Sequence, residues 1–306
     1  MNSIVITGAA GFIGRHLVRY MLDQGMDVYA LVHHGAEGRL PTHERLHVVG
    51  GELSQWETLA SQLPREPEAF IHLAWIGAAP EQRDCTDMQK ENVPLCMNGV
   101  RLAASIGAKR FILPGSTMEY AYCGGLIEAD SCPTPQNAYG SAKIAARFLC
   151  QSLCEELRLP FIYVVITGIY SADRRDSNVI TYAITELLAG RRPSFTALEQ
   201  LWDYVHIDDV TRALYLTALR GKPGAFYTVG HGDNWPLSNY VYMIRDLIDP
   251  AAPLGIGEIP YKNGQLPSSC VDLTAIREDT GYKPEIPFEQ GIREVIETIR
   301  VEKGAS

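Results

Sequence analysis

The sequence predicts an α/β fold: a doubly wound parallel sheet with a smaller C-terminal lobe. Three observations predict it. The chain opens with an apolar run that ends on Gly8, Gly11 and Gly14. Apolar runs then alternate with helical stretches over the first half of the chain, the pattern of β-α-β units. After about Gly168 this alternation stops, and proline and glycine become frequent.

The expected strands are short apolar runs bounded by polar or turn-forming residues, namely residues 3–7, 28–32, 46–49, 70–73, 111–113 and 161–167. The spacing of apolar residues predicts helices over 14–24, 55–62, 92–106 and 138–156. A helix at 210–219 and a strand at 225–229 are expected to return to the sheet. Helices that join parallel strands make right-handed crossovers, so the prediction is a Rossmann-type sheet.

Two interleaved lobes are expected. A dinucleotide-binding domain takes residues 1–168 and 204–230, and a substrate-binding lobe takes 169–203 and 231–306. The 306 residues are enough for one large domain or two modest ones. The proline-rich stretch after residue 250 is typical of short helices joined by loops.

Composition limits the partners and the compartment. The formal charge of −9 argues against a nucleic-acid partner. The chain does not start like a signal peptide, and its strongest apolar run, residues 161–170, is too short to span a bilayer. Seven cysteines without a C-x-x-C pair, with Cys150 and Cys154 expected as buried thiols, fit the cytoplasm.

The glycine-rich corner is the first candidate site. Its G-x-x-G-x-x-G spacing follows a strand and leads into a helix, and Phe12 and Ile13 already stand at helical spacing with the apolar residues of that helix. Glycine allows the tight turn, bare N–H groups can approach a pyrophosphate, and the helix N-terminus favours an anion. The alternative is an ordinary strand–turn–helix junction without a ligand.

The second candidate site combines Tyr139, Lys143 and Ser116. Tyr139 and Lys143 are four residues apart on an expected helix, so both side chains lie on one face. An ammonium beside a phenol favours the phenolate, which prepares Tyr139 for proton transfer; Lys143 could also hold a ribose hydroxyl. Ser116 follows an expected strand and could bond the reacting oxygen. The alternatives are a helix-surface pair and a turn or cap serine.

The glycine-rich corner, the serine at the end of a strand and the Y-x-x-x-K pair, in this order and at these separations, resemble the extended short-chain dehydrogenase/reductase family. Within it they are similar to the nucleotide-sugar epimerases, 4,6-dehydratases and ketoreductases. The similarity extends over almost the whole chain, including residues 72–74, 92–98, 202–210, 280–284 and 289–293. It implies a Ser116–Tyr139–Lys143 triad and a hydride exchanged between a nicotinamide and a sugar carbon. It also implies a homodimer formed through the helices at 92–106 and 138–156.

The resemblance also implies ligand contacts. Those to the cofactor are Gly8, Gly11, Phe12, Ile13, Gly14, His33, Glu52, Leu53, Leu73, Ala74, Asn92, Tyr139 and Lys143. Those to the substrate are Trp75, Thr117, Met118 and Asn178. For Trp75 two interpretations stay open, a wall of the sugar pocket or a core aromatic.

Departures from the family pattern narrow the reaction. Family dehydratases carry Asp-Glu after the catalytic hydroxyl, whereas this chain has Thr117 and Met118, and methionine cannot carry a proton. The arginine that often precedes Asp203 and grips the substrate diphosphate is replaced by Trp202. Substitutes for it are sought among the arginines at 174, 175, 191 and 192.

NADP(H) is expected in preference to NAD(H). The second strand ends at Val32, where the family has an acid that binds the ribose hydroxyls, and His33, His34 and Arg39 follow. The expected activity is NADPH-dependent reduction of a nucleotide-linked 4-ketosugar. The alternatives are 4-epimerisation with retained NAD and a non-catalytic regulator that senses dinucleotides.

Some other motifs are given structural roles. His43 to His47 reads H-E-x-x-H, but it precedes a strand rather than lying on a helix, so no metal site is expected. Asp208 and Asp209 are expected to cap the helix that follows, and His206 is expected to be a structural histidine.

Overall fold

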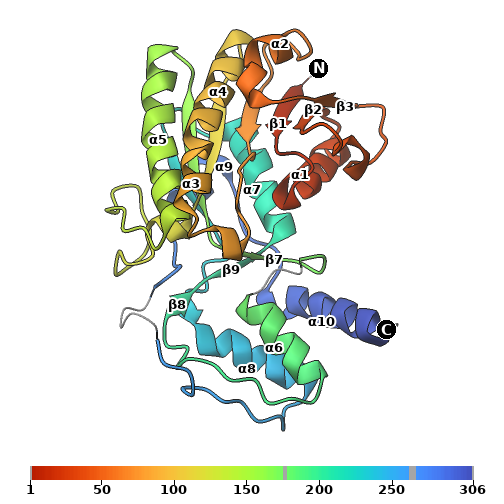
Figure 1. The fold of residues 1–306 in the computed structure, drawn as a ribbon, viewed down its shortest axis with the longest axis vertical. Coiled ribbons are helices and arrows are strands. Elements are labelled where there is room, and N and C mark those ends of the chain that lie inside the picture. The colour runs from red at the N-terminus through yellow and green to blue at the C-terminus, as the bar shows by residue number, and fades with distance from the viewer. Residues whose placement is uncertain (1, 175–177, 262–266, 305–306) are drawn as a thin grey trace.

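The computed structural model describes residues 2–174, 178–261 and 267–304. Within them, parallel strands form one large sheet in the order β10-β6-β5-β4-β1-β2-β3 (Figure 1). Its strands are β1 (Ser3–Thr7), β2 (Asp27–Val32), β3 (Leu46–Gly50), β4 (Ala69–His72), β5 (Phe111–Ser116), β6 (Phe161–Ile166) and β10 (Phe226–Val229). The chain winds outward from β1 to β3 and then from β4 to β10, so the predicted doubly wound sheet is confirmed.

The helices of the larger lobe pack in neighbouring pairs, α4 beside α5 and α1 beside α7 (Figure 1). The bounds are α1 (Phe12–Asp23), α2 (Trp56–Ala60), α3 (Thr86–Lys90), α4 (Asn92–Ser105), α5 (Ala138–Glu156), α7 (Ile207–Arg220) and α9 (Thr274–Thr280). The smaller lobe, below the sheet in Figure 1, contains α6 (Val179–Leu188), α8 (Leu237–Ile248) and α10 (Phe288–Gly304). None of the helices in the described segments is long and apolar enough to cross a membrane.

Two short sheets join the lobes. β7 (Gly168–Tyr170) runs parallel to β9 (Tyr204–His206), and β8 (Leu201–Trp202) runs antiparallel to β11 (Trp235–Pro236). The predicted strands of the large sheet are found within a few residues of their expected bounds because most are buried apolar runs; the edge strand β3 is largely exposed, with Val49 as its buried residue.

β5 is longer than predicted, and its last residue is Ser116. The prediction ended at Leu113, and the next residue, Pro114, has no N–H to donate to a strand ladder. In the structure β4 pairs with β5 only as far as Ile112, whereas β6 pairs with it as far as Ser116. Pro114 therefore lies where β5 no longer has a neighbour on the β4 side.

The core consists of two clusters of buried apolar side chains. One surrounds the large sheet, and the other lies between α6, α8 and α10. Val271, Leu273, Ile276 and Tyr282 pack into the first cluster, although the predicted division assigns them to the smaller lobe. The exact boundaries between the two lobes therefore stay a prediction.

α7 is capped differently from the prediction. His206 precedes the helix, and its Nδ1 accepts the N–H of Asp208 at 3.3 Å. Asp208 and Asp209 lie in the first turn, so the prediction that they cap α7 is wrong. Asp209 is buried and accepts the backbone N–H groups of residues 285–286. His206 is buried and hydrogen-bonded, in agreement with a structural histidine.

The H-E-x-x-H residues do not share a helix. His47 lies on β3 and stacks on Tyr29, with ring centroids 4.4 Å apart. His43 lies before the strand, where its Nδ1 accepts the N–H of Arg45 at 3.1 Å. Cys150 and Cys154 are buried thiols on α5, as expected.

Candidate active site

The corner between β1 and α1 packs closely against the end of β4. Gly8 has φ +66°, and a Cβ on it would lie 2.6 Å from the backbone N of Ala74. A Cβ on Gly14 would lie 2.2 Å from the carbonyl oxygen of Gly8. The N–H of Leu73 donates to Thr7 at 3.1 Å. Only glycine allows this approach, so four predicted cofactor residues meet at one place.

The same corner fits the pyrophosphate of a dinucleotide. Gly11 is exposed and forms the N-cap of α1, which has no side-chain cap. The first N–H groups of this twelve-residue helix can therefore face an anion. Phe12 opens the helix and lies under the guanidinium of Arg174, 5.0 Å from its ring centroid. Ile13 is half-buried beside it.

The corner after β2 holds two histidine–carboxylate pairs. His33 Nδ1 lies 3.1 Å from Glu52 Oε1, and His34 Nδ1 lies 3.8 Å from Glu37 Oε1. Leu53, beside Glu52, is buried in a short 3₁₀ turn. The structure thus places two predicted cofactor residues, His33 and Glu52, in contact. It also brings carboxylates to a corner expected to hold mainly cationic groups.

Tyr139 and Lys143 lie in the first turns of α5. Asn137 caps this helix by accepting the N–H of Gly140 at 3.0 Å. Lys143 is buried, and its Nζ donates to the carbonyl oxygen of Pro114 at 3.0 Å. The same Nζ lies 5.7 Å from the centroid of the Tyr139 ring. The predicted phenol and ammonium are therefore brought together at the end of β5.

Trp75 forms a wall beside this pair. Lys143 Nζ lies 3.7 Å from the centroid of its ring, and the Trp75 and Tyr139 rings meet edge to face at 5.6 Å. The indole N–H donates to Gln89 Oε1 at 2.9 Å, which fixes the ring. Arg83, which sequence reasoning missed, lies 5.4 Å from the centroid of the Tyr139 ring. No motif in the sequence pointed to it.

Ser116 ends β5 and caps the short 3₁₀ turn η4 (Thr117–Glu119), where its Oγ accepts the N–H of Met118 at 3.3 Å. Thr117 is buried, and its hydroxyl accepts a hydrogen bond from Ser269 at 2.7 Å. Thr117 thus connects η4 to the C-terminal part of the chain, which argues against the predicted substrate contact. Met118 is half-buried, and its carbonyl oxygen accepts the N–H of Gln136 at 3.0 Å.

Glu119 is the most unusual residue of the site, and sequence reasoning missed it. Its side chain is 0% exposed. Oε1 accepts the N–H of Ser116 at 2.6 Å, and Oε2 accepts the hydroxyl of Tyr163 at 2.7 Å. Burial raises the pKa of the Glu119 carboxyl to about 7, although both hydrogen bonds act to lower it. The S-x-x-E spacing from Ser116 to Glu119 is a capping-box signal that could have revealed it.

Two predicted ligand contacts, Asn92 and Asn178, also have structural roles, and their contacts with ligands stay a prediction. Asn92 is buried, its Oδ1 accepts the N–H of Ile76 at 2.6 Å, and its Nδ2 donates to the Ile76 carbonyl at 3.0 Å. It therefore supports the loop that carries Trp75. Asn178 caps α6 by accepting the N–H of Thr181 at 2.9 Å.

Three of the four arginines considered as ligands of the substrate diphosphate lie in the described part of the chain, and each binds another group of the protein. Arg174 donates to the carbonyl oxygen of Ile169 at 2.7 Å. Arg191 pairs with Glu186 at 2.6 Å and Arg192 with Glu258 at 2.5 Å. Residue 175 lies outside the described residues.

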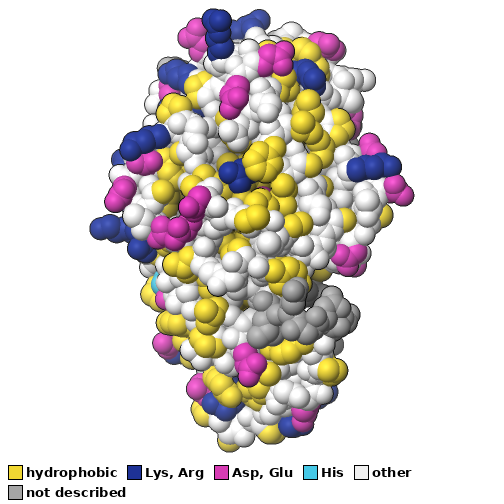
Figure 2. Space-filling model, turned by 90° about the vertical axis from the view of Figure 1, so that its left-hand side faces the viewer, with side chains coloured by type: hydrophobic (Ala, Val, Ile, Leu, Met, Phe, Trp, Pro, Cys, Tyr) yellow, Lys and Arg dark blue, Asp and Glu magenta, His cyan; other side chains and the backbone are white. Residues whose placement is uncertain are grey.

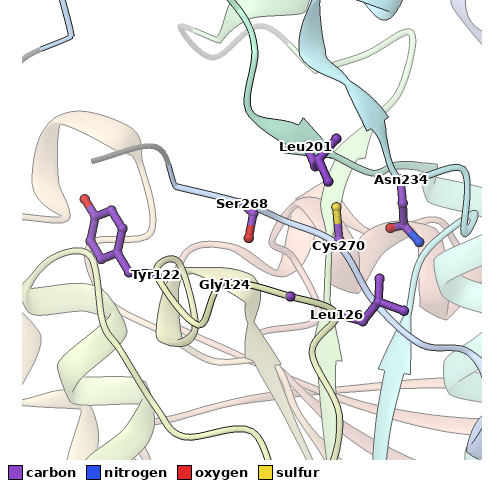
Figure 3. Close-up of a pocket in the computed structure, with 8 residues that line it drawn as sticks. Tyr122, Gly124, Leu126, Leu201, Asn234, Ser268 and Cys270 are labelled. Atoms are coloured by element: carbon purple, nitrogen blue, oxygen red, sulfur yellow. The ribbon is translucent and has the colours of Figure 1, made fainter. Parts of the chain in front are cut away.

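A cavity of about 450 Å³ lies beside the loop that follows η4. Figure 3 shows its lining residues on separate segments: the loop after η4, β8, the residues near Asn234, and the segment at 268–270. Ser269, between the lining residues Ser268 and Cys270, donates to Thr117. The described residues that line this cavity do not include Ser116, Tyr139 or Lys143.

Comparisons with known proteins agree with this geometry. The profile of the NAD dependent epimerase/dehydratase family matches residues 4–230. A dTDP-6-deoxy-L-talose 4-dehydrogenase (NAD(+)) of Aggregatibacter actinomycetemcomitans is 31% identical over 236 residues, covering 73% of this chain and 83% of the relative. A dTDP-glucose 4,6-dehydratase of Haemophilus influenzae is 22% identical and covers 97% of each chain. The structure of MoeE5 with UDP-glucuronic acid and NAD superposes with a TM-score of 0.83 at 25% identity, covering 98% of this chain and 100% of that one.

Proposed function

The chain belongs to the NAD-dependent epimerase/dehydratase family, and on that basis we propose that it reduces a nucleotide-linked 4-ketosugar with a nicotinamide coenzyme. The observation that carries the proposal is the grouping of Tyr139, Lys143 and Ser116 at the end of β5. The 31% identical relative is named a 4-dehydrogenase, which is the same reaction run in reverse.

The proposed chemistry divides the work among three side chains. Tyr139 gives a proton to the carbonyl oxygen of the sugar, and the positive charge of Lys143 stabilises the phenolate that remains. The Oγ of Ser116 accepts the N–H of Met118, which leaves its hydroxyl hydrogen to donate. Ser116 uses this hydrogen to hold the same carbonyl oxygen of the sugar. The bound nicotinamide supplies the hydride.

The surroundings of Ser116 favour reduction over dehydration. Removal of water needs an acid and a base next to the catalytic hydroxyl. Thr117 is buried against Ser269, and the Met118 side chain has no ionisable group that could act as an acid or a base. The nearby acid, Glu119, points into the core toward Tyr163 rather than into the site.

The coenzyme corner supports a modest preference for NADP(H). β2 ends at Val32 without an acid, and His33 and His34 can face a 2′-phosphate. Glu52 and Glu37 each lie against one of these histidines, and their negative charges oppose a 2′-phosphate. We therefore expect NADPH to bind more tightly than NADH by about tenfold at most.

A second candidate, 4-epimerisation with retained NAD, is favoured by one contact. Asp173, after β7, bonds Arg15 at 2.6 Å and His16 at 3.0 Å on α1. This contact holds the loop after β7 against the start of α1, where a trapped coenzyme would be enclosed. Mass spectrometry of nucleotide released from denatured protein separates the two candidates, because stoichiometric NAD supports the epimerase.

The proposal is tested by incubating the protein with the 4-ketone of dTDP-6-deoxy-L-talose and NADPH or NADH, and following the loss of reduced-nicotinamide absorbance. The parent protein is expected to turn over this ketone. Tyr139→Phe is expected to lower kcat by about a hundredfold or more with little change in KM. An unchanged rate in Tyr139→Phe would remove this phenol from the mechanism, and a non-catalytic regulator would then become the better proposal.

We also propose a homodimer in the cytoplasm. Figure 2 views the molecule from the side on which α5 lies, and hydrophobic side chains are spread over this face of the larger lobe. On α5, Phe148 is 50% exposed and Leu149 is 47% exposed. Light scattering is expected to give twice the mass of one chain, and Phe148→Glu is expected to lower the measured mass.

A reducing compartment agrees with the seven cysteines, all of which are free thiols.

A further inference from the structure

Behind Ser116 lies a buried carboxyl group that the proposed reaction does not use. The Glu119 side chain is enclosed between β5, where a Cβ on Gly115 would lie 2.6 Å from its Oε1, and β6, from which Tyr163 donates. A capping box requires only that the side chain of its glutamate accept the backbone N–H of the N-cap residue. Here the same hydrogen bond to Ser116 is made by a fully buried group. The cap alone does not require this burial, because burying a carboxylate is costly.

Two cations of α5 face this carboxyl group. Lys143 and Arg147 are four residues apart, and the charge of each favours the ionised form of Glu119. Arg147 also hydrogen-bonds the hydroxyl of Tyr120 and lies 5.0 Å from the centroid of the Tyr163 ring. The groups that face Glu119 are therefore two phenols and two cations, and one of the cations belongs to the proposed triad.

We propose that Glu119 is a positioning residue whose carboxylate fixes the backbone of Ser116 and so aims the hydroxyl that meets the substrate oxygen. The inference rests on the proposed function. The ionised carboxylate accepts from Ser116 and Tyr163 through two charge-assisted hydrogen bonds, which are stronger than neutral ones. A proton on Oε1 would oppose the N–H of Ser116, which cannot accept. A proton on Oε2 would leave Oε1 as a weaker, neutral acceptor for Ser116 and would force the Tyr163 hydroxyl to turn and find another acceptor.

This arrangement gives the reaction a pH dependence of its own. Burial raises the pKa of Glu119 to about 7, so both forms are populated near neutral pH. Ser116 is held while the carboxyl group is ionised and loosened once it is protonated. kcat is therefore expected to fall as the pH drops below about 7, with KM changed less.

The experiment measures kcat and KM against pH for the 4-ketone of dTDP-6-deoxy-L-talose with NADPH. Glu119→Gln keeps one oxygen for the N–H of Ser116 but cannot titrate. The acidic limb of the pH profile, which is the fall of kcat below about pH 7, is therefore expected to disappear in this variant, and kcat is expected to fall a few-fold. Glu119→Ala removes the acceptor, and kcat is expected to fall by about tenfold or more with KM within about twofold. Tyr163→Phe removes a bond that stabilises the carboxylate, so the limb is expected to move to higher pH.

Tyr227→Phe is the matched control. Tyr227 is also fully buried and donates to a carboxylate, Asp279, at 2.8 Å, but on β10. It is expected to leave the acidic limb where the parent has it. An acidic limb that stays in place in Glu119→Gln, or a kcat of Glu119→Ala within twofold of the parent value, would overturn the proposal. If Glu119→Ala does not fold, the pH profiles of Glu119→Gln and Tyr163→Phe still test the proposal.

Infrared difference spectroscopy provides a readout that needs no substrate. A protonated-carboxyl band with a midpoint near pH 7 is expected in the parent protein and absent from Glu119→Gln. If the band persists in the variant, Glu119 is not the titrating group and the inference fails. If the band is lost but the parent protein does not turn over the ketone, the proposed function fails while the assignment of the titrating group stands.

Discussion

Replacing Glu119 by glutamine is expected to change how the stability of the protein depends on pH. Burial raises the pKa of this carboxyl group from 4.5 to about 7. Between these values the unfolded chain has released its proton and the folded chain still binds it, so the free energy of unfolding decreases as the pH rises. Each unit of pKa difference corresponds to about 1.4 kcal/mol, which gives about 3 kcal/mol in total, of which about 2.5 kcal/mol is lost between about pH 5 and about pH 8.

Glutamine does not titrate, so the stability of Glu119→Gln relative to the parent protein should improve by about 2.5 kcal/mol over that pH interval. Urea unfolding at both pH values, followed by tryptophan fluorescence and circular dichroism, measures this difference. Glu57→Gln, at an exposed carboxyl group on α2, is the control and should show the same difference at both pH values. A pH-independent difference for Glu119→Gln would refute the reasoning.

Three further substitutions test other contacts. Glu52→Gln removes the carboxylate beside His33, so the affinity for NADPH relative to NADH should rise by about fivefold in fluorescence titrations; an unchanged ratio would contradict the placement of the 2′-phosphate. Asp209→Asn leaves Arg212 without its buried partner, and urea unfolding should reveal a loss of about 3 kcal/mol; a loss below about 1 kcal/mol would mean that water replaces the carboxylate. Asp173→Asn weakens the contact with α1 and should speed release of a bound dinucleotide in stopped-flow measurements, and equal rates would exclude a role in retention.

The sheet could be predicted from the sequence because most of its strands are buried apolar runs between turn signals. The positions of the glycines and of Tyr139 and Lys143 followed from that framework. Polar residues were harder to interpret. Asn92 and Asp209 form hydrogen bonds to backbone that is distant in sequence, and no local pattern reveals such partners. Glu119 had a visible cap spacing, but its burial depends on Tyr163 from the neighbouring strand.

The return of residues 271–282 to the core of the larger lobe limits how the protein can be recombined with its relatives. A chimaera that exchanged everything after β10 would also replace Val271, Leu273 and Ile276 against α7 and β10, as well as the Ser269 hydroxyl that supports Thr117. A functional hybrid should therefore exchange residues 169–203 and 231–267 together with α10, which packs against α6 and α8, and keep the native residues 268–282.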